Sequence, residues 1–545
     1  MDDQLQFHLQ RLGALRSDRF YWDDQWEEAA ARVLVADKDK FLSRQSALVG
    51  GGGRKNTELM FDSTAAFAAQ RFSSVIESLA TPQNSIWHRL KAIDPVLRRN
   101  RAARLFFDEL SDVLFQYRYR PVANFVGNSQ QVYLSLGVYG NGILYIDQPD
   151  ETKGLRYRNV HLAEAYFVEN HARIVDTVYR VELMTARQIV QMKGWDVPQD
   201  VTDKAKNAQQ SEEKYEVLHC VYPRTDRDPQ RKDAKGMKFA SLYILVAKKH
   251  QLSEGGYNSF PYAVTRYTQS SGEVYGRGPA QWALPAIKTL NEQKKTVLKQ
   301  GHRIVDPVLL SHDDGSLGTF SLKAGAMNPG GVNKDGKPLV HVLPTGNIAV
   351  GDKMMEMERA ISNDAFLITL FQILIDTPQM TATEVLQRAQ EKGMLLAPTA
   401  GRMQAEFLGQ LIEREIDLLA RQGLLPRIPP ILLEAEAEYR IEYDSPMARM
   451  QRAEKAAGFN RALSNASEYA KMTGDMEALD WFNFDTAMPE ILDINGAPVA
   501  WTRTADEVAE KRASRAEAMQ AQQAVDAAPA MASVAKTAAE VAPTP

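Results

Sequence analysis

Two long helical patterns on either side of a short β pattern constrain this fold more than any other feature. From Gly278 to Gly301, the sequence GPAQWALPAIKTLNEQKKTVLKQG places its apolar residues along one side of a helix. From Val350 to Ile375, apolar residues recur at spacings of three and four, which predicts a second long helix. Between them, RIVDPVLL and PLVHVLP are typical of strands and enclose a segment rich in Gly, Asn and Asp. The chain must therefore accommodate two long helices that are joined through a small β insert.

The first half of the chain predicts helices followed by an antiparallel β region. Helices are indicated from Asn56 to Ala80, from Arg101 onward and from about Val122 to Val138, where Gly140-Asn141-Gly142 marks a turn. A short helix with Thr185 as its N-cap interrupts the β region, and the polar DKAKNAQQSEEK predicts a surface loop. The expected strands are ILYID, the stretch from Leu155 to Val181, YEVLHCVYP, SLYILVAKK and FPYAVTRYTQ. The fold class that follows is α+β, mainly α.

The last part of the chain is expected to be helical. A break at DTPQM precedes a helix that opens with a capping box of Thr381 and Glu384. Pro398 interrupts that helix, and its apolar pattern resumes as far as Gly423. A helical module follows from Pro446 to about Gln522, and the Ala- and Pro-rich end predicts a mobile tail. Long helices are therefore the main architectural feature.

Size, charge and cysteine content narrow the class of protein. The chain has 545 residues and 61.0 kDa, more than a single core of about 250–300 residues. A net charge of −4 and a pI near 6.2 give no overall nucleic-acid signature, so any contact with DNA is expected to be local. The longest apolar run, from Ala365 to Ile375, is shorter than the roughly 20 residues that a bilayer span needs. The N-terminal sequence lacks a signal-peptide pattern, and the single cysteine, Cys220, excludes an internal disulfide. We expect no contact with a membrane.

The stretch VGGGGRKNT is a candidate nucleotide-binding loop, because glycine-rich loops with a lysine can bind phosphates. A Walker A loop requires Gly, four residues and then Gly-Lys-Ser/Thr, and no register of this stretch supplies that order. We interpret residues 50–56 as a flexible linker between an N-terminal segment, residues 1–49, that moves or packs separately, and a helix that begins near Thr57. A weak contact of Arg54 and Lys55 with a phosphate or a neighbouring chain is the alternative.

Other motifs also lack the pattern of a catalytic or metal site. GRGPAQ lacks the third glycine of a dinucleotide fingerprint, so Gly278 and Pro279 predict a turn and a helix start. The histidines form no HExxH pair, and SHDDG lacks the later ligands of a calcium-binding loop. Cys220 lies in an apolar strand pattern, which predicts an inert core thiol. We therefore expect no catalytic residue, no metal site, no cofactor and no enzymatic activity.

Positive charge is concentrated on the first long helix. Against one acid, Glu292, this helix carries Lys288, Lys294, Lys295, Lys299 and Arg303. Such residues form either a solvated helix face or a positive surface beside a polyanion, and the sequence is compatible with both. The basic stretch RRNRAAR, from Arg98 to Arg104, leaves the same two alternatives.

Motifs spread over the chain up to about residue 515 occur in a specific order. They are FDSTAAFAAQRFSSVIESLATPQNSIWHRL, YGNGILYID, VDTVYRVELMTARQIVQ, GEVYGRGPAQWALPAIKTLNEQ and TATEVLQRAQEKGMLLAPTAGRMQAEFLGQLIERE. In this order they resemble the portal, or head-to-tail connector, proteins of tailed bacteriophages, most closely those of short-tailed phages. MTARQ followed by YGRGPAQWAL is a fairly specific pair within that resemblance.

The resemblance implies a dodecameric ring at one vertex of the capsid, through which double-stranded DNA enters and leaves. It implies contacts with the terminase, the major capsid and scaffolding proteins and a tail adaptor protein, in a virion that is assembled in the host bacterial cytoplasm. In such systems the separate terminase hydrolyses ATP, which agrees with the lack of a Walker loop here. A DNA-packaging or DNA-processing ATPase and another virion core or adaptor protein remain as alternatives.

The resemblance also divides the chain into parts. It implies a first stem helix at 273–303, a clip at 304–345 and a second stem helix at 346–375. The tunnel loop that projects into the DNA channel would consist of Asp376, Thr377, Pro378, Gln379 and Met380. The other parts would be a wing at 57–272, a kinked wing helix and its return at 381–444, a helical crown at 445–515 and a disordered tail at 516–545. The stem cations would face either the channel or a neighbouring subunit.

Overall fold

The computed structural model describes most of the chain. The described residues are 2–41, 57–149, 152–311, 321–323, 325–344, 346–369, 398–435, 438–443, 446–473, 480–494, 501–503 and 507–520. They belong to two compact units: unit 1 comprises Met1–Ser85 and Leu114–Leu424, and unit 2 comprises Ile86–Val113 and Leu425–Pro545. Helices predominate, and the strands of the described residues form small antiparallel sheets. The predicted α+β, mainly α class is confirmed.

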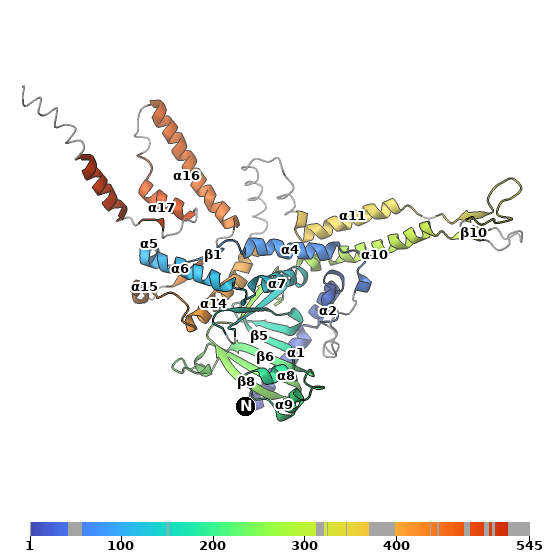
Figure 1. The fold of residues 1–545 in the computed structure, drawn as a ribbon, viewed down its shortest axis with the longest axis horizontal. Helices are drawn as coiled ribbons and strands as arrows, with labels where there is room; N and C mark the ends of the chain where they lie inside the picture. The colour runs from blue at the N-terminus through green and yellow to red at the C-terminus, as the bar shows by residue number, and fades with distance from the viewer. Residues whose placement is uncertain are drawn as a thin grey trace, which may run out of the picture. The chain divides into compact units, whose positions relative to one another are not determined.

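Unit 1 contains two main sheets (Figure 1). The larger has the strand order β4-β5-β6-β7-β8, and the smaller has the order β3-β2-β9. Their strands are β2 (Asn141–Asp147), β3 (Arg156–Asn159), β4 (Ala165–Glu169), β5 (Val175–Thr185), β6 (Lys214–Pro223), β7 (Phe239–Leu245), β8 (His250–Tyr257) and β9 (Tyr262–Arg266). The strands predicted in this region are confirmed, and β8 is a further strand that the sequence analysis did not identify.

Two N-terminal helices, α1 (Asp2–Asp18) and α2 (Phe20–Val33), pack into unit 1. Leu12 of α1 is buried in a hydrophobic core with Tyr179 and Leu218 of the larger sheet. Between the helices, the buried Arg19 donates hydrogen bonds to the carbonyls of Leu162, at 2.9 Å, and Ala165, at 2.7 Å. Residues 2–41 are therefore part of this unit rather than a separately packed segment, while the linker at 50–56 lies outside the described residues.

His8 predicts an acid-sensitive attachment of α1. Its Nδ1 lies 2.7 Å from the Tyr179 hydroxyl, and burial, aided by the charge of Arg11, lowers the pKa of His8 from 6.5 to about 4. Since the folded pKa lies below the unfolded one, His8 contributes stability above pH 6.5 that is lost as the pH falls toward 4. Between pH 7 and 4.5, we expect the Tm of the wild type to fall by roughly 2–5 °C more than that of His8→Gln.

Exposed histidines provide the control for this experiment. His171 is exposed, so His171→Gln should retain the pH dependence of the wild type. The same pH dependence in His8→Gln as in the wild type would contradict the role of His8.

Long helices make up the rest of unit 1. They are α4 (Thr64–Ala80), α7 (Phe125–Tyr139), α10 (Pro279–Val305), α11 (Ile348–Ala365) and α14 (Gly409–Arg421), which follows the π-helical turn η6 (Gln404–Leu408). The short elements are α8 (Ala186–Gln191), α9 (Gln199–Lys206), β10 (Leu309–Ser311), β11 (Val340–Val342) and the 3-10 turns η1 (Val35–Asp37), η2 (Thr57–Leu59), η3 (Leu162–Glu164), η4 (Ala234–Gly236) and η5 (Val246–Lys248). The predicted Thr185 N-cap of α8 is confirmed, with a capping box to Gln188.

Several predicted boundaries are wrong. The helix expected from Asn56 begins only at Thr64. The Asn291 side-chain oxygen accepts hydrogen bonds from the backbone N–H groups of Phe61 and Asp62, which holds these two residues out of the helix. RIVDPVLL is not one strand, since α10 continues to Val305 before β10 begins. Part of the predicted surface loop DKAKNAQQSEEK is the helix α9.

The second long helix also differs from expectation, whereas the predicted interruption at Pro398 stays a prediction, because residues 370–397 lie outside the described residues. α11 ends at Ala365 rather than running to Ile375, and Leu367 adopts a left-handed φ of 59° in the turn that follows. Residues 398–403 are helical and lead into η6, so the irregularity of this helix in the described residues is the π-turn. The capping box at Thr381 lies outside the described residues.

Unit 2 combines a two-stranded sheet with helices. β1 (His88–Ala92) pairs with β12 (Tyr439–Tyr443), a pairing that the sequence analysis missed. The helices are α5 (Pro95–Arg99), α6 (Arg101–Arg118, whose last turn belongs to unit 1), α15 (Pro430–Glu434), α16 (Pro446–Thr473) and α17 (Phe484–Ile494). Within the basic RRNRAAR stretch, Arg101 forms an ion pair of 2.8 Å with Glu507.

Candidate functional site

The helices α10 and α11 and the β10–β11 hairpin form an extension of unit 1, which we call the arm. The two helices run side by side away from the sheets of this unit, and the hairpin lies at their outer end (Figure 1). Their packing is close, because a Cβ added at Gly351 would lie 2.7 Å from Cγ2 of Val297. Gln300 on α10 also donates a hydrogen bond to the carbonyl of Gly346. The predicted pair of long helices joined through a small β insert is therefore confirmed.

The five predicted cations of α10 do not form a single cluster. Four of them share the side of the helix that faces away from α11, at spacings of seven, four and four residues, and we call this side the basic face: Lys288, Lys295, Lys299 and Arg303. Lys294 lies on another side of the helix and is half-buried.

Two residues of the basic face are partly neutralised within the chain. Lys288 forms an ion pair of 2.6 Å with Glu28 of α2. Lys295 lies 3.8 Å from Glu292, and its Nζ is 5.6 Å from the centre of the Phe61 ring. Lys299 and Arg303 are exposed, and the described part of the chain provides no ion-pair partner for either. The excess positive charge therefore lies at the outer end of α10.

The other candidate residues give a simpler result. The predicted tunnel loop, from Asp376 to Met380, lies outside the described residues. The described residues contain no group of three His, Cys, Asp or Glu side chains that could hold a metal ion. Cys220 is buried in β6, and burial raises the pKa of its thiol, as expected for an inert core cysteine. In the same residues, no helix is both long and apolar enough for a membrane span.

The root of the arm is a direct contact between glycine backbones. Gly140 ends α7 with a φ of 74°, and Gly276 and Gly278 precede α10. A Cβ at Gly140 would lie 2.4 Å from the Gly278 nitrogen and 2.5 Å from the Gly276 oxygen. A Cβ at Gly278 would lie 2.7 Å from the Gly140 nitrogen. Because no side chain fits at these positions, the YGNG and YGRG motifs form one junction, which we call the glycine junction.

Asn141 fixes the glycine junction by hydrogen bonds. Its buried side chain donates to the carbonyls of Tyr139, at 2.9 Å, and Gly276, at 3.0 Å, and accepts from the Gly276 N–H at 2.8 Å. Next to it, the Gln281 side chain accepts from the Gly278 N–H at 2.9 Å, which caps the start of α10. Pro279 is the first residue of the helix, as the sequence predicts.

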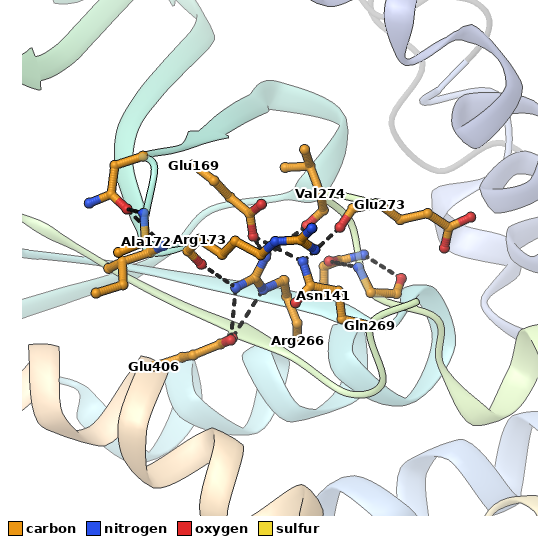
Figure 2. Close-up of polar contacts among 12 residues, drawn as sticks. Asn141, Glu169, Ala172, Arg173, Arg266, Gln269, Glu273, Val274 and Glu406 are labelled. Atoms are coloured by element: carbon orange, nitrogen blue, oxygen red, sulfur yellow. Dashed lines mark hydrogen bonds and ion pairs between the residues drawn. The ribbon is translucent and has the colours of Figure 1, made fainter. Parts of the chain in front are cut away.

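Arg266, at the end of β9, holds the segment before α10 against the helix that contains η6 (Figure 2). Its guanidinium donates to the Val274 carbonyl at 3.0 Å and to both carboxylate oxygens of Glu406, at 2.8 and 3.1 Å. It also forms an ion pair with Glu169 of β4. Residue 274 precedes the arm and residue 406 follows it, so one side chain holds both ends of the segment that contains the arm.

The electrostatics of this network favour the charged state of Arg266. Its side chain is only 1% exposed. Burial alone would lower the pKa of the guanidinium, but the hydrogen bonds to Glu406 and Glu169 outweigh burial and raise the pKa. Gln269 donates a further hydrogen bond of 2.9 Å to Glu169. The network is therefore a fixed brace at the root of the arm.

No local pattern in the sequence identifies Asn141, Arg266 or Glu406 as residues that fix the root of the arm. Arg266 lies 140 residues from Glu406, so no local pattern could identify the contact. The available signal is indirect: the sequence predicts turns at Gly140-Asn141-Gly142 and at Gly278-Pro279, and both contribute to this root. The site as a whole is a rigidly attached arm with a charged outer end, which suits it to carry an interface.

Comparisons with known proteins cover nearly the whole chain. The family model described as bacteriophage head to tail connecting protein matches residues 6–501. The chain is 26% identical over 522 residues to the portal protein of Salmonella phage epsilon15, which covers 93% of this chain and 90% of that protein. It is 27% identical over 525 residues to the probable portal protein of Bordetella phage BPP-1, with the same coverage of 93% and 90%.

Proposed function

The chain belongs to the family of bacteriophage head to tail connecting proteins, and from this premise we infer that it functions as a portal protein. A portal protein is a structural component of the virion that forms an oligomeric ring and contacts both the capsid and the tail. We propose no enzymatic role for the chain. The observation that carries this function is the extent of the match, since the family model matches residues 6–501 and both relatives cover 93% of the chain.

The finer details of the function are proposals. The ring has twelve subunits, surrounds double-stranded DNA and sits at one capsid vertex, where the genome is packaged and later ejected. The terminase, the major capsid and scaffolding proteins and a tail adaptor protein bind to it during assembly in the host cytoplasm. The support for these details is the family membership.

The parts of the chain can be assigned within this proposal. The arm corresponds to the stem and clip, with α10 and α11 as stem helices. The clip, expected at 304–345, begins only after Val305, where α10 ends. The residues from Asp376 to Met380 form the tunnel loop in the channel. The residues around the two main sheets form the wing, and the helical module from residue 445 to residue 515 forms the crown. The match over residues 6–501 supports this order of parts.

A channel for DNA should bind its cargo weakly. Each phosphate that a cation neutralises adds a salt-dependent contribution to binding, and tight contacts would slow the passage of DNA. The net charge of −4 is compatible with weak contact.

Imaging of the purified protein tests this function. We expect negative-stain images to show closed rings with a central hole, because the function requires a conduit. A protein that remains monomeric at micromolar concentration would contradict the proposal.

A deletion variant in the same experiment tests the tunnel loop. Without Asp376–Met380, the protein should still form rings but should fail to support packaging or retention of DNA in a complementation assay. Loss of the rings themselves would contradict the placement of this loop in the channel.

A further inference from the structure

The loop between β6 and β7, residues 224–238, is strongly basic within a chain whose net charge is −4. Its sequence, RTDRDPQRKDAKGMK, contains six basic and three acidic residues, which gives it a net charge of +3. We call it the basic loop. Five of its six cations are exposed: Arg227, Arg231, Lys232, Lys235 and Lys238. This loop therefore gives unit 1 a positive surface that is separate from the basic face of α10.

The basic loop has a defined conformation, although the described residues 224–238 contain no regular element besides the 3-10 turn η4. The Gly236 N–H donates to the Asp233 carbonyl at 3.0 Å. The backbones approach so closely that a Cβ at Gly236 would lie 1.9 Å from the Arg231 oxygen. The Nε of Arg227 donates to the Gly236 carbonyl at 3.1 Å, which holds this side chain against the turn. Compact surface loops of this kind are frequently functional, and this one fixes the positions of the cations that it carries.

Most of the positive charge of the basic loop is not neutralised within the described part of the chain. Arg224 is buried and pairs with Glu254 at 3.2 Å, while the exposed Arg231 pairs with Asp233. The remaining cations have no ion-pair partner among the described residues: Arg227, Lys232, Lys235 and Lys238. Four like charges on one short loop repel one another, so they are unfavourable for the isolated chain and favourable for binding an anion.

The connection at the opposite end of the larger sheet, residues 186–213 between β5 and β6, has a different charge pattern. It contains four basic and five acidic residues, and two of its four cations form ion pairs. Arg187 pairs with Glu212 at 3.1 Å, and Lys204 pairs with Glu213 at 2.7 Å. A long polar connection on this sheet therefore does not require an excess of cations, and the excess in the basic loop is a feature of that surface.

The side chains of the basic loop indicate which kind of anion it fits. None of its residues is aromatic, and none is among the large apolar side chains that are exposed. Protein interfaces have an apolar core, and proteins that bind single strands stack the bases on aromatic rings. The phosphate backbone of a duplex needs only cations in suitable positions. A double-stranded nucleic acid is therefore the partner whose chemistry matches the loop.

We propose that the basic loop binds the phosphate backbone of double-stranded DNA at a site separate from the arm. The free Arg and Lys side chains neutralise phosphates, and such contacts do not read the base sequence. In a ring, every subunit contributes one such loop, and individually weak contacts add up when several loops bind the same molecule. That this DNA is the viral genome rests on the proposed portal function, whereas the site itself rests on the loop.

Binding of the assembled protein to covalently closed circular duplex DNA tests this site, because a circle has no end to enter a ring channel. Mobility shifts between about 50 and 200 mM salt give the affinity and its salt dependence. The variant with Lys232→Gln, Lys235→Gln and Lys238→Gln should bind about tenfold or more weakly at about 100 mM salt, since three phosphate contacts are lost. The slope of log K against log salt should also fall by about 2–3, at roughly 0.9 for each lost contact.

Three exposed lysines elsewhere in unit 1 provide a matched control. Lys193→Gln, Lys206→Gln and Lys249→Gln together remove the same charge from the opposite end of the larger sheet. They should leave both the affinity and the salt slope unchanged. Both triple variants should fold and form rings, as circular dichroism and negative-stain images can verify, because every substituted lysine is exposed. Polyglutamate should displace the circular DNA less effectively than linear duplex DNA does at the same concentration of charge.

The outcomes separate this inference from the proposed function. Wild-type rings that do not bind circular DNA at about 50 mM salt would overturn the site and leave the portal function in place. DNA binding that the loop variant loses, by a protein that forms no rings, would contradict the function and not the site. Equal affinity of the wild type and the loop variant, or an equal loss in the control, would overturn the site. Displacement by polyglutamate as effective as displacement by linear DNA would instead assign the basic loop to an acidic protein segment.

Discussion

Gly140→Ala is expected to lower the free energy of unfolding of unit 1 by about 2–5 kcal/mol. The left-handed φ of 74° costs an L-residue roughly 1–2 kcal/mol. The new Cβ must also displace the backbone of Gly278 and Gly276, from which it would lie 2.4 and 2.5 Å, and such overpacking costs roughly 1–3 kcal/mol. Urea unfolding followed by tryptophan fluorescence measures the change.

Gly194 provides a matched control for this substitution. It has a φ of 80°, and a Cβ there would meet nothing within 4 Å. Gly194→Ala should therefore cost only the roughly 1–2 kcal/mol of backbone strain. If Gly140→Ala lowers the free energy of unfolding no more than Gly194→Ala does, the backbone contact at the glycine junction is not as close as described.

Glu415→Gln is expected to destabilise unit 1 by about 3–5 kcal/mol, the usual cost of breaking a buried ion pair from one side. Glu415 pairs with Arg118, and both side chains are 0% exposed. Arg118 Nε donates to Glu415 at 2.9 Å, and the Tyr157 hydroxyl donates to the same carboxylate. Glutamine keeps the shape but removes the negative charge, so the guanidinium remains buried without its ion-pair partner. The same unfolding measurement gives the size of the effect.

Two further variants show whether burial of the ion pair causes this loss of stability. The exposed pair of Arg187 and Glu212, at 3.1 Å, offers Glu212→Gln as a control, which should cost at most about 1 kcal/mol. Replacing the whole buried group by apolar residues, with Arg118→Met, Glu415→Met and Tyr157→Phe together, should recover most of the stability, because no charge is then left buried. If Glu415→Gln lowers the free energy of unfolding no more than Glu212→Gln does, burial of the ion pair is not the cause.

Local patterns in the sequence predicted much of this fold. Helical periodicity correctly indicated α10 and the start of the second arm helix, and the Thr185 N-cap was confirmed at α8. These features depend on residues a few positions apart, for which a single stretch of sequence contains the necessary information. The order of several such stretches was also enough to recognise the family.

The wrong or missing predictions lie where the local structure depends on residues that are distant in the sequence. The start of α4 depends on Asn291, which lies more than 200 residues from the backbone groups that it binds. The pairing of β1 with β12 joins Leu90 to Ile441. The brace at Arg266 likewise depends on Glu406, so neither composition nor spacing could reveal it. The place of Asp376–Met380 in the channel stays a prediction.

The glycine junction has a geometric consequence for a closed ring. Side-chain contacts can adapt by changing rotamers, whereas a backbone-to-backbone contact leaves the angle between α7 and α10 almost no freedom. In a ring, each subunit must turn the next by the same fraction of a full circle, and a small angular error in one subunit is multiplied by the number of subunits. An arm attached through three glycines therefore sets the angular tolerance of the whole assembly, and a change of a few degrees there would favour an open spiral over a closed circle.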